Sequence, residues 1–229
     1  EGREPARWSR EQPDLRVYAF APDNAALLED AGAWSSVRGA RAHPYRRMRV
    51  WDAAGGDELR FDADALGRTQ LGWIIENALL VDRLWAALPA AGVDIRCPAR
   101  VEAMEQDADG VVLRLDDGTR LDARLAVAAD GADSTLRRLA GLEVSGRDYA
   151  QRGVVAFVGT ERPHEDTAWQ RFLPSGPLAF LPFEQGLSSI VWTLPDDEAA
   201  RVLALDDDAF NRELTRAFAA RLGELRLAS

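Results

Sequence analysis

The chain has 229 residues, of which 47% are hydrophobic and 29% charged, so it can form one large or two small globular domains. Its formal net charge of −10 argues against nucleic acid or anionic lipid headgroups as the main partner. The single cysteine, Cys97, excludes a disulfide framework, and no apolar run reaches the roughly 20 residues of a membrane span.

The first half of the chain mixes helical and strand patterns. Its predicted elements are a strand at 15–21, a helix at 22–32, a hairpin at 45–61, a strand at 71–75 and a helix at 77–91. Asp23 can cap the first helix and Gly32 can end it. The hairpin turns at Gly55 and Gly56, and Gly92 closes the second helix.

The second half is dominated by strand patterns. Its predicted elements are strands at 95–97, 100–104, 111–115, 120–127, 154–159, 169–172, 178–181 and 189–193, then helices at 196–203 and 207–222. Cys97 falls in the first of these strands and is expected to be a small buried hydrophobe. The only histidines, His43 and His164, are expected at the surface or in loops.

One local motif carries chemical information. The apolar run Leu125–Ala129 predicts a strand that leads into Asp130-Gly131 and a helix from Thr135, capped by Asp133 or Ser134. A helix N-terminus offers free N–H groups and partial positive charge, which suit a phosphate. Taken alone, the motif is more readily a plain strand–turn–helix in which Asp130 bonds its own turn.

Residues 129–137 read Ala-Asp-Gly-x-x-Ser-x-x-Arg, which resembles the Asp-Gly motif of flavoprotein hydroxylases such as para-hydroxybenzoate hydroxylase. Further strings resemble one branch, the ubiquinone-biosynthesis FAD-dependent hydroxylases. They are LRVYA at 15–19, AW at 33–34, YRRM at 45–48, VWD at 50–52, LGWIIEN at 71–77, GPLAFLP at 176–182 and SIVW at 189–192. The resemblance runs in register over essentially the whole chain.

The resemblance implies an α/β (α+β) fold with two domains. A partial doubly wound FAD-binding domain is expected at 1–44 and 70–145, and an antiparallel-sheet substrate-side domain at 45–69 and 146–229. The implied activity is an FAD- and NAD(P)H-dependent monooxygenase that hydroxylates the ring of a prenylated phenol or quinol in ubiquinone biosynthesis. The implied setting is cytoplasmic, peripheral to the inner membrane, in a biosynthetic complex at its surface. Two alternatives stay open: another flavin oxidoreductase of this fold, or a non-catalytic module that binds prenyl lipid or a partner.

The resemblance also assigns cofactor-binding positions, each with a plainer alternative. Glu1 corresponds to the acidic residue that holds the adenine ribose, or is a frayed terminal residue. Arg16 corresponds to an arginine near the flavin pyrophosphate, or forms a surface salt bridge. Asn77 lies where a helix begins near the cofactor and can also be its N-cap. Val101 would meet the adenine through its backbone, or is a core valine.

Asp130 and Gly131 correspond to the residues that serve the flavin pyrophosphate and the nicotinamide donor. No acid–base catalyst is expected, since the flavin carries the chemistry. The family's Gly-x-Gly-x-x-Gly phosphate loop and its later Gly-Asp segment are absent from this sequence, which starts at Glu1 and so suggests a fragment or processed chain. We therefore expect this chain to bind FAD weakly or not at all and to lack hydroxylase activity.

Overall fold

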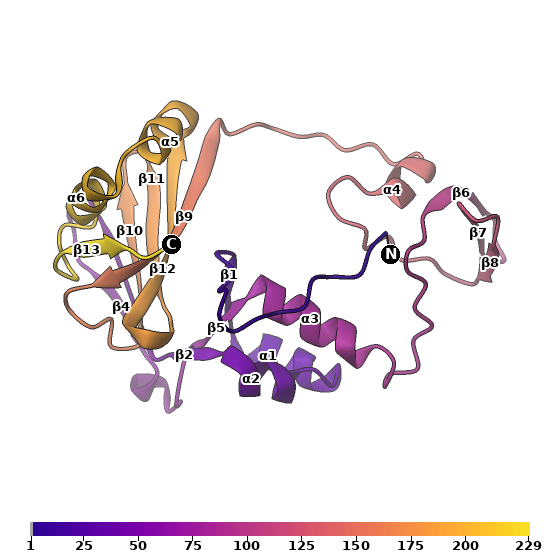
Figure 1. Ribbon diagram of the computed structural model, residues 1–229, viewed down its shortest axis with the longest axis horizontal. Helices are drawn as coiled ribbons and strands as arrows, with labels where there is room; N and C mark the ends of the chain where they lie inside the picture. Colours follow the sequence, from indigo (N-terminus) through magenta and orange to yellow (C-terminus); the bar gives the residue numbers. More distant parts are fainter. Residues whose placement is uncertain (1) are drawn as a thin grey trace. The chain divides into compact units, whose positions relative to one another are not determined.

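The computed structural model describes residues 2–229, so Glu1, the expected ribose ligand, lies outside the described residues. The chain forms two compact units (Figure 1). The small unit combines the N-terminal residues up to Ala6 with Leu88–Arg147, and the large unit combines Arg7–Ala87 with Asp148–Ser229. The division into a flavin-binding and a substrate-side domain stays a prediction. Within residues 2–229, no helix combines the length and the apolarity needed to cross a membrane.

The larger sheet of the large unit has seven strands in the order β13-β9-β12-β11-β10-β3-β4. Their bounds are β3 (Arg47–Asp52), β4 (Leu59–Asp62), β9 (Gln151–Thr160), β10 (Thr167–Leu173), β11 (Gly176–Pro182), β12 (Leu187–Pro195) and β13 (Leu225–Leu227). Neighbouring strands pair antiparallel except β3 with β10, which are parallel. The predicted hairpin at 45–61 and the four predicted strands after residue 150 are confirmed.

One face of this sheet is covered by α5 (Asp196–Leu203) and α6 (Asp207–Ala217), as Figure 1 shows. Alternate residues of each strand point to this face, so apolar side chains from the strands and both helices form one core. At its centre, the rings of Phe180 and Phe218 stack with centroids 3.9 Å apart.

The second sheet of the large unit has the order β1-β5-β2, and all its pairings are antiparallel. Its strands are β1 (Val17–Phe20), β2 (His43–Tyr45) and β5 (Gly72–Glu76), and its helices are α1 (Pro22–Asp30), α2 (Trp34–Arg41) and α3 (Asn77–Ala87). Ile75 of β5 and Leu79 of α3 are fully buried against side chains of α1 and α2. The sheet is thus covered by helices on the side where its apolar residues lie.

Two details of this helical layer differ from the sequence predictions. Asp23 does not cap α1: the N-cap is Ala21, without a side-chain cap, and Pro22 begins the helix. Helix α2 was not predicted, because Ser35, Ser36 and Gly39 give the segment low helix propensity. Packing of Trp34 and Val37 into the core stabilises it instead.

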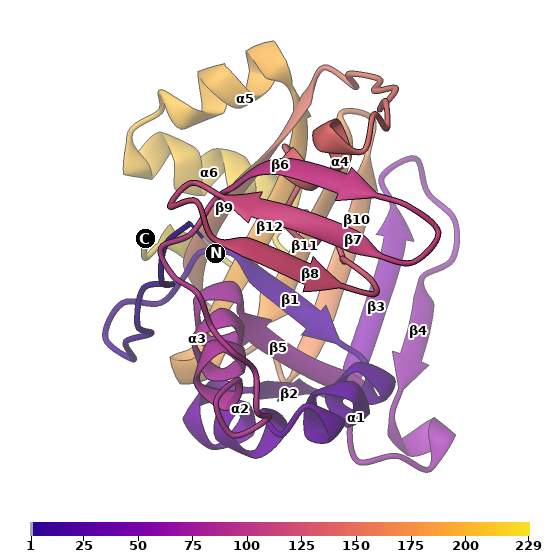
Figure 2. The same cartoon turned by 90° about the vertical axis from the view of Figure 1, so that its right-hand side faces the viewer.

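The small unit contains a meander of β6 (Val101–Gln106), β7 (Val111–Leu115) and β8 (Arg120–Ala123), followed by helix α4 (Thr135–Leu139), shown in Figure 2. Ser134 caps α4 as predicted, since its Oγ accepts a hydrogen bond from Arg137 N at 3.0 Å.

Two predicted strands of the small unit are wrong. Residues 95–97 are not a strand, and Cys97 is only half-buried. Residues 125–129 are not a strand either, and Leu125 and Val127 are 76% and 74% exposed. A strand is stabilised by ladder hydrogen bonds, and within residues 2–229 no strand pairs with this segment. The apolar composition of 125–129 was therefore insufficient to form the predicted strand.

Candidate functional site

Arg16 and Asn77 are brought together in the large unit by the pairing of β1 with β5. The register sets Val17 opposite Glu76, so the residue before β1 faces the residue after β5. Asn77 N donates a hydrogen bond to Arg16 O at 2.9 Å. Arg16 and Asn77 are far apart in the sequence but therefore meet at one end of the β1–β5 strand pair.

The side chains of this pair keep donors that the described part of the chain does not use. The exposed Arg16 guanidinium has no hydrogen bond or ion pair within residues 2–229. Asn77 Oδ1 accepts a hydrogen bond from the Tyr18 hydroxyl at 3.1 Å, which leaves the amide nitrogen of Asn77 as a donor. Forked N–H donors beside an amide suit phosphate oxygens and other acceptors of a nucleotide cofactor.

Asn77 is the first residue of α3, and it does not cap that helix. The cap comes from a distant segment, since Asp14 Oδ2 accepts a hydrogen bond from Ala78 N at 2.9 Å. The N-cap reading of Asn77 is therefore wrong, because its side-chain oxygen faces Tyr18 instead of a helical N–H.

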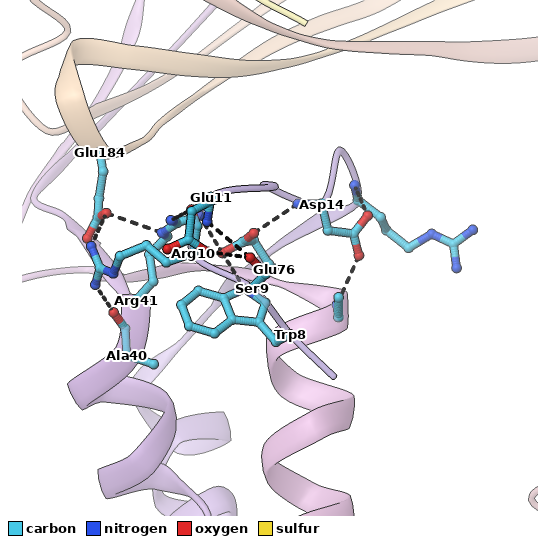
Figure 3. Close-up of polar contacts among 11 residues, drawn as sticks. Trp8, Ser9, Arg10, Glu11, Asp14, Ala40, Arg41, Glu76 and Glu184 are labelled. Atoms are coloured by element: carbon cyan, nitrogen blue, oxygen red, sulfur yellow. Dashed lines mark hydrogen bonds and ion pairs between the residues drawn. The ribbon is translucent and has the colours of Figure 1, made fainter. Parts of the chain in front are cut away.

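Glu76, the residue before Asn77, carries a buried carboxylate, which Figure 3 shows with Trp8, Arg41 and Asp14. Glu76 is 0% exposed, and its Oε2 accepts hydrogen bonds from Trp8 Nε1 at 3.2 Å and Arg41 Nη1 at 3.1 Å. Its Oε1 accepts a hydrogen bond from Asp14 N at 2.9 Å. Three donors thus compensate the loss of water around the buried charge.

Arg41 extends the network to the seven-stranded sheet. The guanidinium is buried, and its Nε lies 3.2 Å from Glu184 Oε2, in the turn between β11 and β12. Arg10 binds the same carboxylate at 3.0 Å and donates to Ala40 O, while Arg41 also donates to Arg10 O. The rings of Trp8 and Phe183 lie 5.2 and 5.4 Å from the Arg41 guanidinium carbon.

Sequence reasoning missed this network. The signal that could have found it is a glutamate that ends the apolar run of β5, because such a position is buried and needs a cation. The cation, Arg41, is the last residue of α2, a helix that was not predicted, so its burial was not visible in the sequence.

In the small unit, Asp130 stabilises its own turn and the start of α4. Its Oδ2 accepts from Thr135 N at 2.7 Å and Leu136 N at 3.2 Å, and its Oδ1 accepts from Ser134 Oγ at 2.5 Å. The hydrogen bond from Ser134, with help from those two backbone N–H groups, holds the pKa of Asp130 below its usual range. Gly131 has φ +87°, a conformation that favours glycine.

Asp130 and Val101 border one open cleft of about 780 Å³ within the small unit. Its other lining residues are Gly2, Ala99, Arg100, Val127, Ala129, Asp133, Thr135 and Leu136. Val101 is half-buried at the start of β6, so its backbone borders the cleft. The cleft is large enough for part of a nucleotide. Because the Asp130 carboxylate is used internally, a ligand here would be met by backbone groups and by the other lining side chains, among them the exposed cation Arg100.

One group in the large unit has the composition of a metal site. The ligand atoms of His43, His164 and Asp166 lie within 4.8 Å of one another. However, His164 Nδ1 accepts from Asp166 N at 3.1 Å, and its Nε2 lies 3.2 Å from Phe183 O. Both ring nitrogens are thus occupied, and His43 Nε2 contacts Asp166 Oδ1 at 3.0 Å. The group is a hydrogen-bonded junction of loops in which a metal would have to displace existing bonds.

His164 lies in a loop, one of the two settings predicted for the histidines, but it is not at the surface, since it is only 7% exposed. Burial, with a smaller effect from His43, lowers the pKa of His164 below its usual value, so this ring is neutral near pH 7. His43 lies in β2 and is half-buried. The burial of His164 was not visible in the sequence, because the loop before β10 is polar.

Comparison with known proteins settles the family. A family model described as FAD binding domain matches residues 7–228, nearly the whole chain. The chain belongs to this FAD-binding family. The match covers Arg16, Asn77, Val101, Asp130 and Gly131, so every described candidate residue lies inside it.

Ubiquinone hydroxylases are among the relatives of this family member, which confirms the predicted resemblance. A 3-demethoxyubiquinol 3-hydroxylase from Escherichia coli is 36% identical over 216 residues, 93% of this chain and 54% of that protein. Ubiquinone hydroxylase UbiL from Rhodospirillum rubrum is 37% identical over 216 residues, 93% of this chain and 49% of that protein. The chain spans about half the length of these relatives.

Solved structures show the same fold. PqsL from Pseudomonas aeruginosa in complex with 2-aminobenzoylacetate has a TM-score of 0.70 at 21% identity, over 99% of this chain and 65% of that one. Klebsiella pneumoniae HpxO complexed with FAD and uric acid has a TM-score of 0.59 at 23% identity, over 89% of this chain and 52% of that one. The expected mixed α/β fold class is confirmed.

Proposed function

We propose that the protein carrying this sequence is an FAD- and NAD(P)H-dependent monooxygenase that hydroxylates the ring of a prenylated phenol or quinol in ubiquinone biosynthesis. The observation that carries the proposal is the 36–37% identity to two ubiquinone hydroxylases over 93% of the chain. Other flavoproteins of this fold match at only 21–23% identity. The specific branch is therefore favoured over the wider fold.

The residues present fit FAD in two places. The unpaired Arg16 guanidinium and the Asn77 amide nitrogen offer donors to phosphate or ribityl oxygens, and Val101, Asp130 and Gly131 border or neighbour a nucleotide-sized cleft. When bound, the flavin supplies the redox chemistry, and the protein supplies position and electrostatics. Asp130 acts by fixing the turn that presents the backbone of Gly131, since its carboxylate is already bonded.

An exposed apolar face supports an aromatic, prenylated substrate. Trp51 and Phe180 point to the helix-covered core of the seven-stranded sheet, so the intervening residues point to its other face. That face includes half-buried or partly exposed apolar side chains: Val50, Leu59, Phe61, Val155 and Phe172. An apolar face of this kind is suited to bind a ring and an isoprenoid chain.

The proposal is tested on the full-length protein that contains this sequence. Purified protein is incubated with FAD, NADH or NADPH and a short-chain prenylated phenol, and the product is analysed by mass spectrometry. Gain of one oxygen atom supports the proposal. Reduction of the flavin with no oxygenated product would favour another oxidoreductase. Binding of the phenol without FAD, and no turnover, would favour a non-catalytic prenyl-lipid module.

A second titration addresses the isolated 229-residue chain. We propose that it binds FAD weakly or not at all, because the Gly-x-Gly-x-x-Gly loop is absent from its sequence. Flavin fluorescence is followed during the titration, and micromolar or tighter binding would refute this part. We also propose that the whole protein acts in the cytoplasm, peripheral to the inner membrane in a biosynthetic complex. Fractionation of membranes with and without a salt wash tests that placement.

A further inference from the structure

Asp14 is hydrogen-bonded to Glu76 of the buried Arg41–Glu76 pair, as Figure 3 shows, and also to the backbone at or beside the two candidate flavin-contact residues of the large unit. Its Oδ1 accepts a hydrogen bond from Arg16 N at 3.0 Å, and its Oδ2 accepts one from Ala78 N at 2.9 Å. One carboxylate therefore bridges Arg16 and the residue after Asn77. The hydrogen bond from Asn77 N to Arg16 O, 2.9 Å long, closes the same loop of contacts.

Asp14 is itself held in place by the buried Glu76. Its N–H donates to Glu76 Oε1 at 2.9 Å, and Glu76 is fixed by Arg41 and Trp8. The half-buried Asp14 thus links the fully buried Glu76 to the exposed Arg16 and the half-buried Asn77. Residues held by several directed bonds lose little further freedom when a ligand binds, which favours affinity.

We propose that Asp14 is a positioning residue for the flavin. Through this clasp, defined as Asp14 with its bonds to Arg16, Glu76 and Ala78, it fixes the backbone positions from which the Arg16 guanidinium and the Asn77 amide extend. Asp14 does not contact the flavin, because both its oxygens are directed to backbone N–H groups of the chain. The inference rests on the proposed function, in which Arg16 and Asn77 bind FAD.

The test uses the full-length protein, stripped of flavin, and two measurements. FAD affinity is measured by fluorescence titration, and amide hydrogen exchange is measured at Arg16 and Ala78 without FAD. The variants are Asp14→Ala, Asp14→Asn, Arg16→Ala and the double variant Asp14→Ala/Arg16→Ala. Asp23→Ala is the matched control, since Asp23 is exposed in the next helix and makes no cap.

Asp14→Ala should accelerate exchange at both amides and weaken FAD binding on the order of 10-fold. Asp14→Asn keeps one acceptor oxygen and should have a smaller effect on both, and Asp23→Ala should have none. In the Arg16→Ala background, Asp14→Ala should have a smaller further effect on FAD affinity, because only the part that acts through Asn77 remains. A purely structural role would instead give independent, multiplying effects.

Three outcomes would overturn the inference, and they are distinguishable. Unchanged exchange in Asp14→Ala would show that the clasp does not hold these amides. Normal FAD affinity in Asp14→Ala, with Arg16→Ala impaired, would show that positioning by Asp14 is not needed. A wild-type protein that binds no FAD would overturn the proposed function and this inference together, whatever the exchange shows.

Discussion

The two units of the chain stabilise their candidate residues in opposite ways. In the large unit, the backbone around Arg16 and Asn77 is held by other residues, chiefly the buried ion pair of Glu76 and Arg41, which we call the frame of this unit. In the small unit, Asp130 is both the candidate residue and the frame, because its carboxylate holds the turn and the start of α4.

The composition of the units explains this difference. All seven tryptophans lie in the large unit, and residues 88–147 contain no aromatic residue and no histidine. Among the described residues of the small unit, the buried apolar side chains are Val111 and Leu115. With little apolar burial available, local hydrogen bonds must define the Asp130 turn. Ligand-facing donors can be left free only where a core already fixes the backbone.

The largest expected effect is the removal of the cation from the frame of the large unit. Arg41→Met keeps much of the side-chain stem but leaves Glu76 as a buried charge without its ion-pair partner. We expect a loss of about 3–5 kcal/mol in the free energy of unfolding. Urea unfolding followed by tryptophan fluorescence measures it, because every tryptophan reports on this unit.

Arg38→Met is the matched control for that experiment. Arg38 lies on the same helix, is exposed, and makes no ion pair within residues 2–229. Its substitution should change stability by no more than about 0.5 kcal/mol. Equal losses in the two variants would show that the buried pair is not the frame of the large unit.

In the small unit, the next largest effect should come from the backbone. Gly131 has φ +87°, and a Cβ at this position would meet no atom within 4 Å. Gly131→Ala should therefore cost about 1–2 kcal/mol through conformational strain alone. Urea unfolding followed by circular dichroism, with hydrogen exchange in β6–β8, measures the loss. Gly146→Ala is the control, since Gly146 has no positive φ and no nearby atom.

Local patterns in the sequence predicted most elements of this fold. Alternation over 154–193 gave the strands β9–β12, and the turn glycines Gly55 and Gly56 gave the β3–β4 hairpin. The strand predicted at 125–129 was wrong, because an apolar run in the sequence cannot show whether a partner strand exists to pair with it. Helix α2 was missed because core packing of Trp34 and Val37 offsets its poor helix propensity.

The candidate site was predictable only where it follows from resemblance. The resemblance placed Arg16 and Asn77 near a common ligand. In the structure, a backbone hydrogen bond joins these two residues. The roles of Asp14 and Glu76 were missed, since the bond from Ala78 N to Asp14 spans 64 residues. Contacts between such distant residues leave no periodic signal in a single sequence.

A smaller, local effect is expected for Asp130→Ala. The Thr135 and Leu136 N–H groups and the Ser134 hydroxyl would lose their acceptor, so the first turn of α4 should fray. Hydrogen exchange at these two amides should accelerate while tryptophan-detected unfolding stays unchanged. If exchange does not change, the turn is held by something other than Asp130, and the contrast between the units fails.

The smallest effect is expected from pH, and it should be confined to the large unit, which holds both histidines. Burial lowers the folded-state pKa of His164 below the usual 6.5, so in moderate acid the unfolded chain binds a proton that the folded chain excludes. The stability contributed by neutral His164 is thus complete above about pH 6.5 and is lost as pH falls through its folded pKa.

Tryptophan-detected urea unfolding between about pH 8 and 5 should show this decline in the wild type. His164→Gln should flatten it, while the exchange rates of β6–β8, corrected for intrinsic pH dependence, stay level in both proteins. An undiminished slope in His164→Gln would show that His164 is not the source of the decline.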